Sequence, residues 1–86
     1  MPLRLRSDIA TTDTDDSLVL LDERTGRYWQ LNSTGAAVLH ALLAGRHPDQ
    51  IADDLATRYR IDVAQAQHDV TALTTQLQAA KLVQSS

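Results

Sequence analysis

Three histidines are the side chains of this sequence best suited to binding a metal ion or moving a proton: His40, His47 and His68. No two of them are four residues apart, the spacing that places two imidazoles on one face of a helix. We expect them on different elements, so their pattern predicts no metal site. The sequence also lacks Cys, which excludes a thiolate metal site, a thiol nucleophile and a disulfide framework.

Two neighbouring carboxylates, Asp53 and Asp54, are the next candidates for chemistry. On a helix their side chains diverge, which suits a solvated surface better than an acid and base pair. The three glycines do not have the spacing of a phosphate-binding loop. We find no set of nucleophile, base and orienting residue, and therefore predict a protein that is not an enzyme and needs no cofactor.

The charge of the chain argues against nucleic acid as a partner. The formal net charge is −3, and no Lys or Arg lies between Arg60 and Lys81, where a recognition helix would need them. A helix, short turn and helix from Pro48 onward does resemble a helix-turn-helix, so a DNA-binding regulator stays an alternative. There is no apolar run long enough for a bilayer or a secretory signal, so we expect a cytoplasmic protein that does not bind membranes.

The first part of the chain has the periodicity of short strands. Apolar and polar residues alternate over residues 3–9, which predicts a strand, whereas the acidic segment 10–16 (ATTDTDD) predicts an exposed loop. Segments SLVLLD and RYWQL within residues 17–31 are rich in strand-forming residues. Gly26, between them, can adopt the positive φ of a tight turn, so residues 17–31 are expected to form a β-hairpin.

The second part has helical periodicity. Asn32 or Ser33 can cap a helix over residues 34–44, Pro48 suits the start of a second helix, and Asp62 can cap a third. Apolar residues recur at spacings of three and four along the third helix: Val63, Ala66, Val70, Leu73, Leu77 and Ala80.

These elements predict an α+β fold, similar to a winged helix-turn-helix, in which a three-stranded antiparallel sheet is followed by three helices. The chain of 86 residues suits one domain over residues 1–83, with residues 84–86 as a frayed tail. If the strands pair in chain order, the last of them exposes unpaired backbone groups at the sheet edge. On that strand Trp29 shares a face with Leu31, while Tyr28 and Gln30 share the other.

From Leu20 to Ile51 the chain resembles the PqqD-like family of recognition elements, which serve precursor peptides made on the ribosome and then modified (RiPPs). The resemblance is carried by the turn at Gly26, the aromatic strand, the Leu31-Asn32 step into the first helix, and Gly45, and it extends to the closing Lys81-Leu82-Val83. Within the family the chain is most similar to the standalone leader-binding proteins of bacterial lasso peptide biosynthesis. It departs from PqqD itself, which usually has a Pro-Glu-Gly type of turn where this chain has Glu23-Arg24-Thr25-Gly26.

The resemblance implies that the leader of a precursor peptide adds as an antiparallel strand beside Arg27 to Leu31 and packs into a groove bounded by the third helix. We expect Val70, Leu73 and Leu77 to be the residues of that helix most prone to lie in the core instead. The predicted leader-binding residues are Arg27, Tyr28, Trp29, Gln30, Leu31, Asp69, Val70, Leu73 and Gln76.

The resemblance also implies which proteins share the pathway. A separate leader-cleaving cysteine protease of transglutaminase-like fold would receive the bound precursor, and an ATP-dependent lasso cyclase would close the ring. The alternatives left open are the DNA-binding regulator and a PqqD-type adaptor in another peptide-modification pathway.

Overall fold

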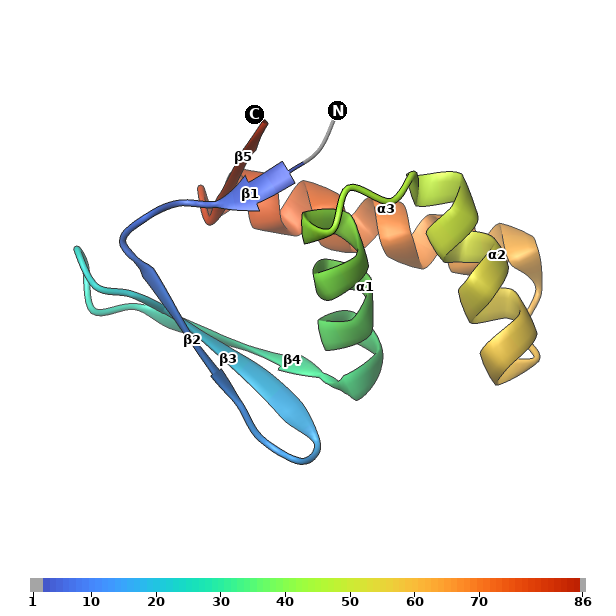
Figure 1. Cartoon of the computed structure of the whole chain (residues 1–86), viewed down its shortest axis with the longest axis horizontal. Helices are drawn as coiled ribbons and strands as arrows, with labels where there is room; N and C mark the ends of the chain where they lie inside the picture. The colour runs from blue at the N-terminus through green and yellow to red at the C-terminus, as the bar shows by residue number, and fades with distance from the viewer. Residues whose placement is uncertain (1–2, 86) are drawn as a thin grey trace.

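The computed structural model describes residues 3–85, which form five strands and three helices (Figure 1). In chain order these are β1 (Leu3–Leu5), β2 (Ile9–Asp13), β3 (Ser17–Asp22), β4 (Tyr28–Asn32), α1 (Ser33–Leu43), α2 (Pro48–Tyr59), α3 (Val63–Ala79) and β5 (Val83–Ser85). The predicted class is confirmed, because a three-stranded antiparallel sheet is followed by three helices.

The three-stranded sheet has the order β2-β3-β4 and is antiparallel throughout. Its β3–β4 hairpin is the one predicted over residues 17–31, with Leu20 opposite Trp29. Gly26 has a φ of +78°, as the turn was expected to require, and its N–H donates to the carbonyl of Asp22 at 2.8 Å. The turn therefore brings β4 back along β3 in a fixed register.

Each helix begins at a residue that caps its free N–H groups. Asn32 Oδ1 accepts a hydrogen bond from Gly35 N at 2.8 Å, and Asp62 caps α3 as predicted. At the start of α2 the cap is His47, whose Nδ1 accepts from Asp49 N at 3.2 Å. One of the three histidines is thus accounted for by local structure.

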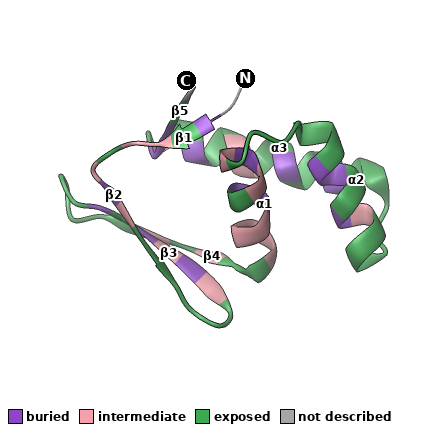
Figure 2. Ribbon diagram, viewed as in Figure 1, coloured by how far each residue is buried: buried purple, intermediate pink, exposed green. Residues whose placement is uncertain are grey.

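The core lies where the inner face of the sheet meets the helices (Figure 2). α1 leads from the end of β4 to α2, and α3 runs back to bring the chain's end beside β1 (Figure 1). With no Phe and one Trp in the sequence, the packing is almost entirely aliphatic. The buried apolar residues are Leu3, Ile9, Leu18, Leu20, Val38, Leu39, Leu42, Ile51, Ala52, Leu55, Ala66, Val70, Leu77, Leu82 and Val83.

The prediction of a single strand over residues 3–9 is wrong. The chain turns after β1, where Ile9 N donates to the carbonyl of Arg6 at 3.1 Å and the Arg6 guanidinium donates to Asp8 Oδ2 at 2.8 Å. Alternation continues across this turn by coincidence, because a polar turn and a polar strand position look alike in sequence. β1 and β2 consequently belong to two different sheets.

The prediction of a loop over residues 10–16 is also wrong for most of that segment. β2 runs through Asp13 and pairs with β3 from Ile9 opposite Asp22 to Asp13 opposite Leu18. An edge strand needs its backbone pairing with β3, not an apolar face, so its Thr and Asp side chains can remain in solvent.

The end of the chain differs from the predicted frayed tail as well. Gln84 and Ser85 belong to β5, which pairs with β1 through Leu5 opposite Val83 and Arg4 opposite Gln84. Leu82 and Val83 are buried, which anchors this two-stranded ribbon to the core. The final residue, Ser86, lies outside the described residues.

Candidate functional site

The outer edge of β4 carries backbone groups that no strand of the described chain pairs with. Asp22 N donates to the carbonyl of Arg27 at 2.8 Å, which sets the alternation along the strand. The N–H and C=O groups of Trp29 and Leu31 therefore point toward β3, and those of Tyr28 and Gln30 point outward. An extended peptide could bond to these two residues without disturbing the sheet.

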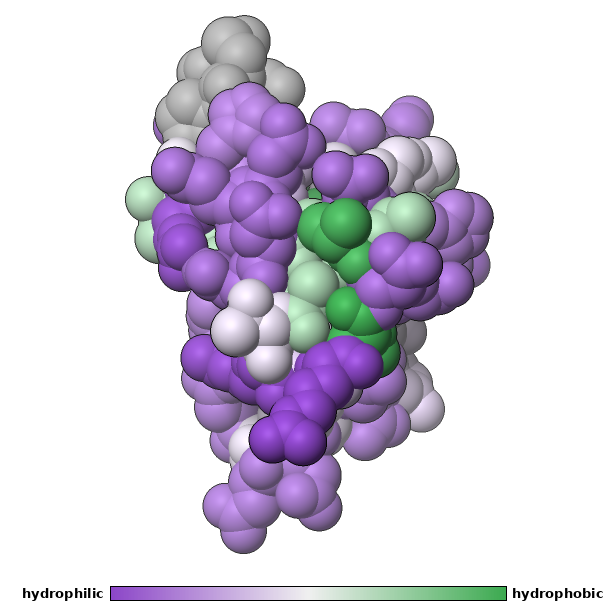
Figure 3. Space-filling model, turned by 90° about the vertical axis from the view of Figure 1, so that its right-hand side faces the viewer, coloured by the Kyte–Doolittle hydropathy of each residue, from purple (hydrophilic) through white to green (hydrophobic). Residues whose placement is uncertain are grey.

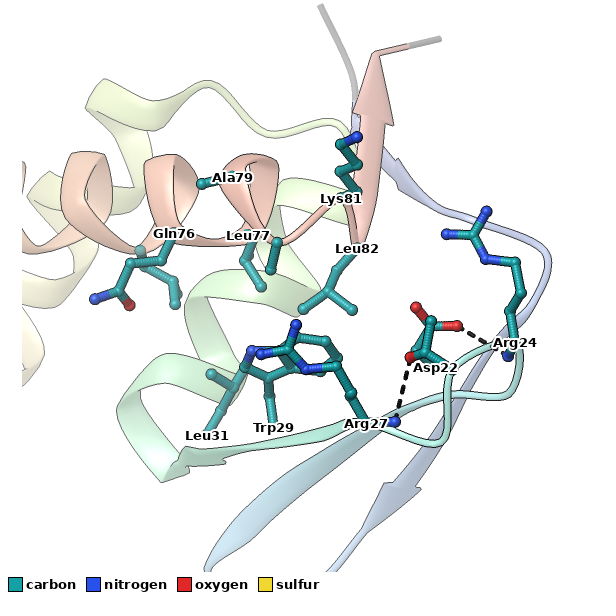
Figure 4. Close-up of a pocket in the computed structure, with 13 residues that line it drawn as sticks. Asp22, Arg24, Arg27, Trp29, Leu31, Gln76, Leu77, Ala79, Lys81 and Leu82 are labelled. Atoms are coloured by element: carbon teal, nitrogen blue, oxygen red, sulfur yellow. Dashed lines mark hydrogen bonds between the residues drawn. The ribbon is translucent and has the colours of Figure 1, made fainter.

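A hollow of about 770 Å³ lies beside this edge, between the β3–β4 hairpin and the C-terminal part of α3 (Figure 4). We call it the β4–α3 groove. It is lined by Asp22, Arg24, Thr25, Arg27, Trp29, Leu31, Leu73, Gln76, Leu77, Ala79, Ala80, Lys81 and Leu82. Trp29 and Leu31 point from β4 toward α3, from which Gln76 and Leu77 point back (Figure 4). The groove is thus an apolar slot with an open strand edge along one side.

The structure brings together five of the nine residues predicted to bind a peptide: Arg27, Trp29, Leu31, Leu73 and Gln76 all line the groove. The predicted alternation along β4 is confirmed, since Trp29 and Leu31 are half-buried on the groove side.

The remaining four predicted residues lie elsewhere. Val70 does not line the groove: its side chain is 1% exposed and belongs to the core, where we expected this residue to be prone to lie. Asp69 is on the surface of α3, where its carboxylate accepts a hydrogen bond from Gln65 at 2.9 Å, and it does not line the groove. Tyr28, 70% exposed, and Gln30 have side chains on the other face of the sheet, so they adjoin the groove only through their backbone.

The sequence analysis missed two groups of groove-lining residues, one in the β3–β4 turn and one at the C-terminal end of α3. Arg24 and Thr25 come from the hairpin turn, and the segment from Ala79 to Leu82 comes from the end of α3. Lys81 has a φ of +60°, which turns the chain sharply out of the helix. The sequence did contain a signal for the second group: Lys81-Leu82-Val83 directly follows the apolar stripe of the third helix. Because that helix was expected to bound the groove, the residues that follow its end were candidates to line the groove as well.

Asp22 is the one buried charged residue of the described chain, at 4% exposure. Burial favours its neutral form, but hydrogen bonds from the backbone of Arg24 and Thr25 and the positive charge of Arg24 outweigh this, and the pKa of Asp22 is lowered. Its Oδ1 accepts from Arg24 N at 2.9 Å. The carboxylate therefore fixes the hairpin turn at the end of the groove.

Two other hollows are smaller. One of about 250 Å³ lies between the β2–β3 loop and α1, and one of about 80 Å³ lies between α1 and α2. Viewed from the α2–α3 end, the surface is mostly hydrophilic, with apolar side chains gathered in a narrow central strip (Figure 3). The first of these meets the edge strand β2 only at Asp13 and is lined mainly by acidic and hydroxyl side chains, and the second adjoins no strand, so the β4–α3 groove is the strongest candidate site.

The chemistry of the groove suits binding. Its polar side chains are two arginines, a lysine, a threonine, a glutamine and the turn carboxylate, with no histidine or cysteine. Within residues 3–85 no cluster of three His, Asp or Glu side chains could hold a metal ion. Over the same range no helix is long and apolar enough to cross a membrane. An apolar wall, an open edge and few polar groups are the features of a peptide-binding surface.

Comparison with known proteins identifies the family to which this arrangement belongs. The family described as coenzyme PQQ synthesis protein D (PqqD) matches residues 17–83. The chain belongs to this family. The matched region begins at β3 and ends at β5, so it contains every residue that lines the groove. A comparison with curated protein sequences gave no match.

Two solved structures share the whole fold. One, described as lasso peptide synthetase B1 complexed with the leader peptide, is 38% identical with a TM-score of 0.92, and the match covers 99% of this chain and 100% of that one. The other, TbiB1 in complex with the TbiA(beta) leader peptide, is 24% identical with a TM-score of 0.84, covering 96% of each chain. At that lower identity the second likeness shows the fold alone.

Proposed function

We propose that this chain binds the leader segment of a ribosomally made lasso peptide precursor and presents it to separate processing enzymes. The leader adds as an antiparallel strand to the outer edge of β4 and packs its side chains against α3. The chain acts as one recognition domain, in the cytoplasm, and contributes no chemistry of its own.

The geometry of the β4–α3 groove is the observation that carries this proposal. The outward backbone groups of Tyr28 and Gln30 supply hydrogen bonds that any extended peptide can make. Specificity then comes from side chains on the groove face, where Trp29, Leu31 and Leu73 offer apolar contacts. A binding surface of this kind accepts a peptide strand and leaves the sheet unchanged.

The comparison with solved structures supports the same assignment. The structure at 38% identity is a lasso peptide synthetase B1 complexed with its leader peptide, and it matches this chain over nearly its full length. Since the groove in this chain is formed by the shared elements, we assign the same kind of ligand to it.

The role of such a chain in a pathway is to raise the local concentration of the precursor and fix its orientation. We propose that the partners are a leader-cleaving cysteine protease of transglutaminase-like fold and an ATP-dependent lasso cyclase. The second of these receives the core peptide after the leader has been removed.

The family match supports a second candidate, an adaptor in another peptide-modification pathway, because the family is described by coenzyme PQQ synthesis. The lasso peptide role and this adaptor role would use the same groove and differ only in which precursor peptide binds there. The DNA-binding alternative has less support, because α3 contains no Lys or Arg along its whole length.

Calorimetric titration of the full chain with a synthetic leader tests the proposal, using the precursor encoded beside this chain's gene. We expect a dissociation constant of about 1 μM or tighter, corresponding to roughly 8 kcal/mol of binding free energy, and loss of binding when the leader is scrambled. A folded chain that binds neither this leader nor the leader of another neighbouring precursor would refute the proposal.

A further inference from the structure

On the basis of the proposed function, we propose that the end of the β4–α3 groove at the hairpin turn binds an acidic side chain of the leader, and that Arg27 is its specificity-determining residue. The leader is then recognised by an apolar pattern that ends in Asp or Glu. This inference names the chemistry of the ligand, which the shape of the groove alone leaves open.

The charges of the groove are gathered at one end. Three cations line the groove, and Asp22 is its single lining carboxylate. Arg24 and Lys81 lie on the side of the turn, and Arg27 extends from the turn so that its guanidinium lies over the Trp29 ring (Figure 4). The opposite end is lined by Leu31, Leu73 and Gln76, which are uncharged. Figure 4 shows this division, with Arg24 and Lys81 on the side of the turn and Leu31 and Gln76 on the other. The chain as a whole carries a net charge of −3, so this positive end is a local feature.

Arg27 is the cation placed to meet a peptide. Its guanidinium carbon lies 5.7 Å from the centre of the Trp29 ring, a cation–π arrangement that holds it over the groove wall. Within residues 3–85 neither Arg27 nor Lys81 forms an ion pair, while Arg24 lies 3.7 Å from Asp8. The guanidinium of Arg27 thus has its five donors available for a carboxylate.

The carboxylate already present does not neutralise Arg27. Asp22 directs its Oδ1 to the backbone of Arg24 at 2.9 Å, inside the turn. Arg6, the other nearby cation, is also occupied, because it donates to Asp8 and, at 2.8 Å, to the carbonyl of Lys81. The positive charge that remains for a ligand therefore centres on Arg27, with Arg24 and Lys81 flanking it.

Strand geometry places the acidic residue in the peptide. A peptide antiparallel to β4 runs from Leu31 toward Arg27, so its C-terminal residues lie at the turn. In the peptide, residues that hydrogen-bond to Tyr28 and Gln30 alternate with residues that lie opposite Leu31, Trp29 and Arg27. The peptide residues opposite Leu31, Trp29 and Arg27 occupy non-hydrogen-bonded positions, where the side chains of the two strands are closest. The side chains of these peptide residues lie on the groove face. The expected pattern, from N- to C-terminus, is apolar, any, apolar, any, acidic.

Fluorescence anisotropy with the full chain tests this inference. The probes are the labelled synthetic leader of the neighbouring precursor and variants in which one Asp or Glu at a time becomes Asn or Gln. The chain variants are Arg27→Gln, Arg27→Lys and the control Arg58→Gln, which removes the same charge from the exposed surface of α2. Circular dichroism establishes that each variant is folded.

We expect one amide variant, at the C-terminal end of the bound segment, to bind about fivefold more weakly, the upper range for an exposed ion pair. Arg27→Gln should weaken the unaltered leader equally, and combining both changes should add nothing further, because they remove the same interaction. Arg27→Lys should retain most of the affinity and Arg58→Gln all of it. The fivefold difference should shrink at 1 M salt.

Failure of this inference looks different from failure of the proposed function. The acidic site is refuted, and leader binding stands, in either of two outcomes. In the first, the unaltered leader binds tightly and Arg27→Gln does not change its affinity. In the second, Arg27→Gln weakens the binding of the unaltered leader and of every amide variant by the same factor. If the unaltered leader does not bind the folded chain, the proposed function and the acidic site fall together.

Discussion

The three-stranded sheet has two edges, β2 and β4, and they are equivalent in backbone chemistry. Each exposes outward N–H and C=O groups: on β4 those of Tyr28 and Gln30, and on β2, by the same alternation, those of Thr11 and Asp13. Only the β4 edge has a groove of about 770 Å³ beside it. The β2 edge leads into the acidic loop of residues 14–16, whose charges oppose pairing with another chain.

The difference shows that an exposed strand edge becomes a binding surface through its neighbours. α3 supplies the apolar wall opposite β4, whereas the hollow that meets β2 at Asp13 is lined mainly by acidic and hydroxyl side chains. Polar and charged side chains protect the β2 edge, whereas the β4 edge carries the single Trp of the sequence. Four experiments would break or sharpen this comparison, from the largest expected effect to the smallest.

Changing the apolar wall should have the largest effect. Leu73→Asp places a carboxylate where the leader would cover it, at a cost of about 3 kcal/mol, which weakens leader binding by roughly a hundredfold in a calorimetric titration. Thr75→Asp is the matched control, because it adds the same charge to α3 at an exposed position that does not line the groove.

If Leu73→Asp does not fold, Leu73→Thr provides the same test with a smaller polar change. A folded variant at Leu73 that binds the leader as tightly as the Thr75 control would show that α3 is not the second wall of the binding site.

A change on the core side of α3 should lower the stability of the fold and leave leader binding unchanged, the opposite of a change at Leu73. Val70→Ala removes two buried methyl groups from a side chain that is 1% exposed, so we expect the free energy of unfolding to fall by about 2 kcal/mol. Urea unfolding measures this loss, and the leader affinity of the folded protein should be unchanged. A variant that keeps its stability and loses affinity would return Val70 to the groove.

A direct comparison of the two edges comes from proline. Gln30→Pro removes an outward N–H from β4, and Thr11→Pro removes one from β2, so both should fold. Loss of one hydrogen bond to the leader costs about 1 kcal/mol, and with the bulk of the ring we expect Gln30→Pro to weaken binding by about tenfold. Equal affinities for the two variants would exclude strand addition at β4.

The smallest effect concerns the turn that ends the groove. Because the pKa of Asp22 is lowered in the folded protein, its ionised form stabilises the fold above the unfolded-state pKa of about 4, and this stability is lost as the pH falls through the lower folded value. Urea midpoints at pH 5 and pH 3 should therefore differ less for Asp22→Asn than for the unaltered chain. An identical pH dependence in both proteins would contradict this role.

Sequence reasoning succeeded where local chemistry decides the structure. The cap at Asp62, the helix start at Pro48 and the positive φ of Gly26 follow from single residues, and all three are confirmed. It failed where pairing is decided by distant segments. β2 carries few apolar residues and β5 pairs with β1 from the other end of the chain, so neither has a local signature of a strand.

The site divides in the same way. Alternation along β4 was enough to separate Trp29 and Leu31 from Tyr28 and Gln30, because adjacent strand residues point to opposite faces. Along α3, periodicity could not distinguish Val70 from Leu73, since both lie on the apolar stripe. The sequence alone thus determined the elements and the edge they leave open. Only the tertiary structure decided which part of α3 packs in the core and which part faces β4, because that depends on where the helix crosses the sheet.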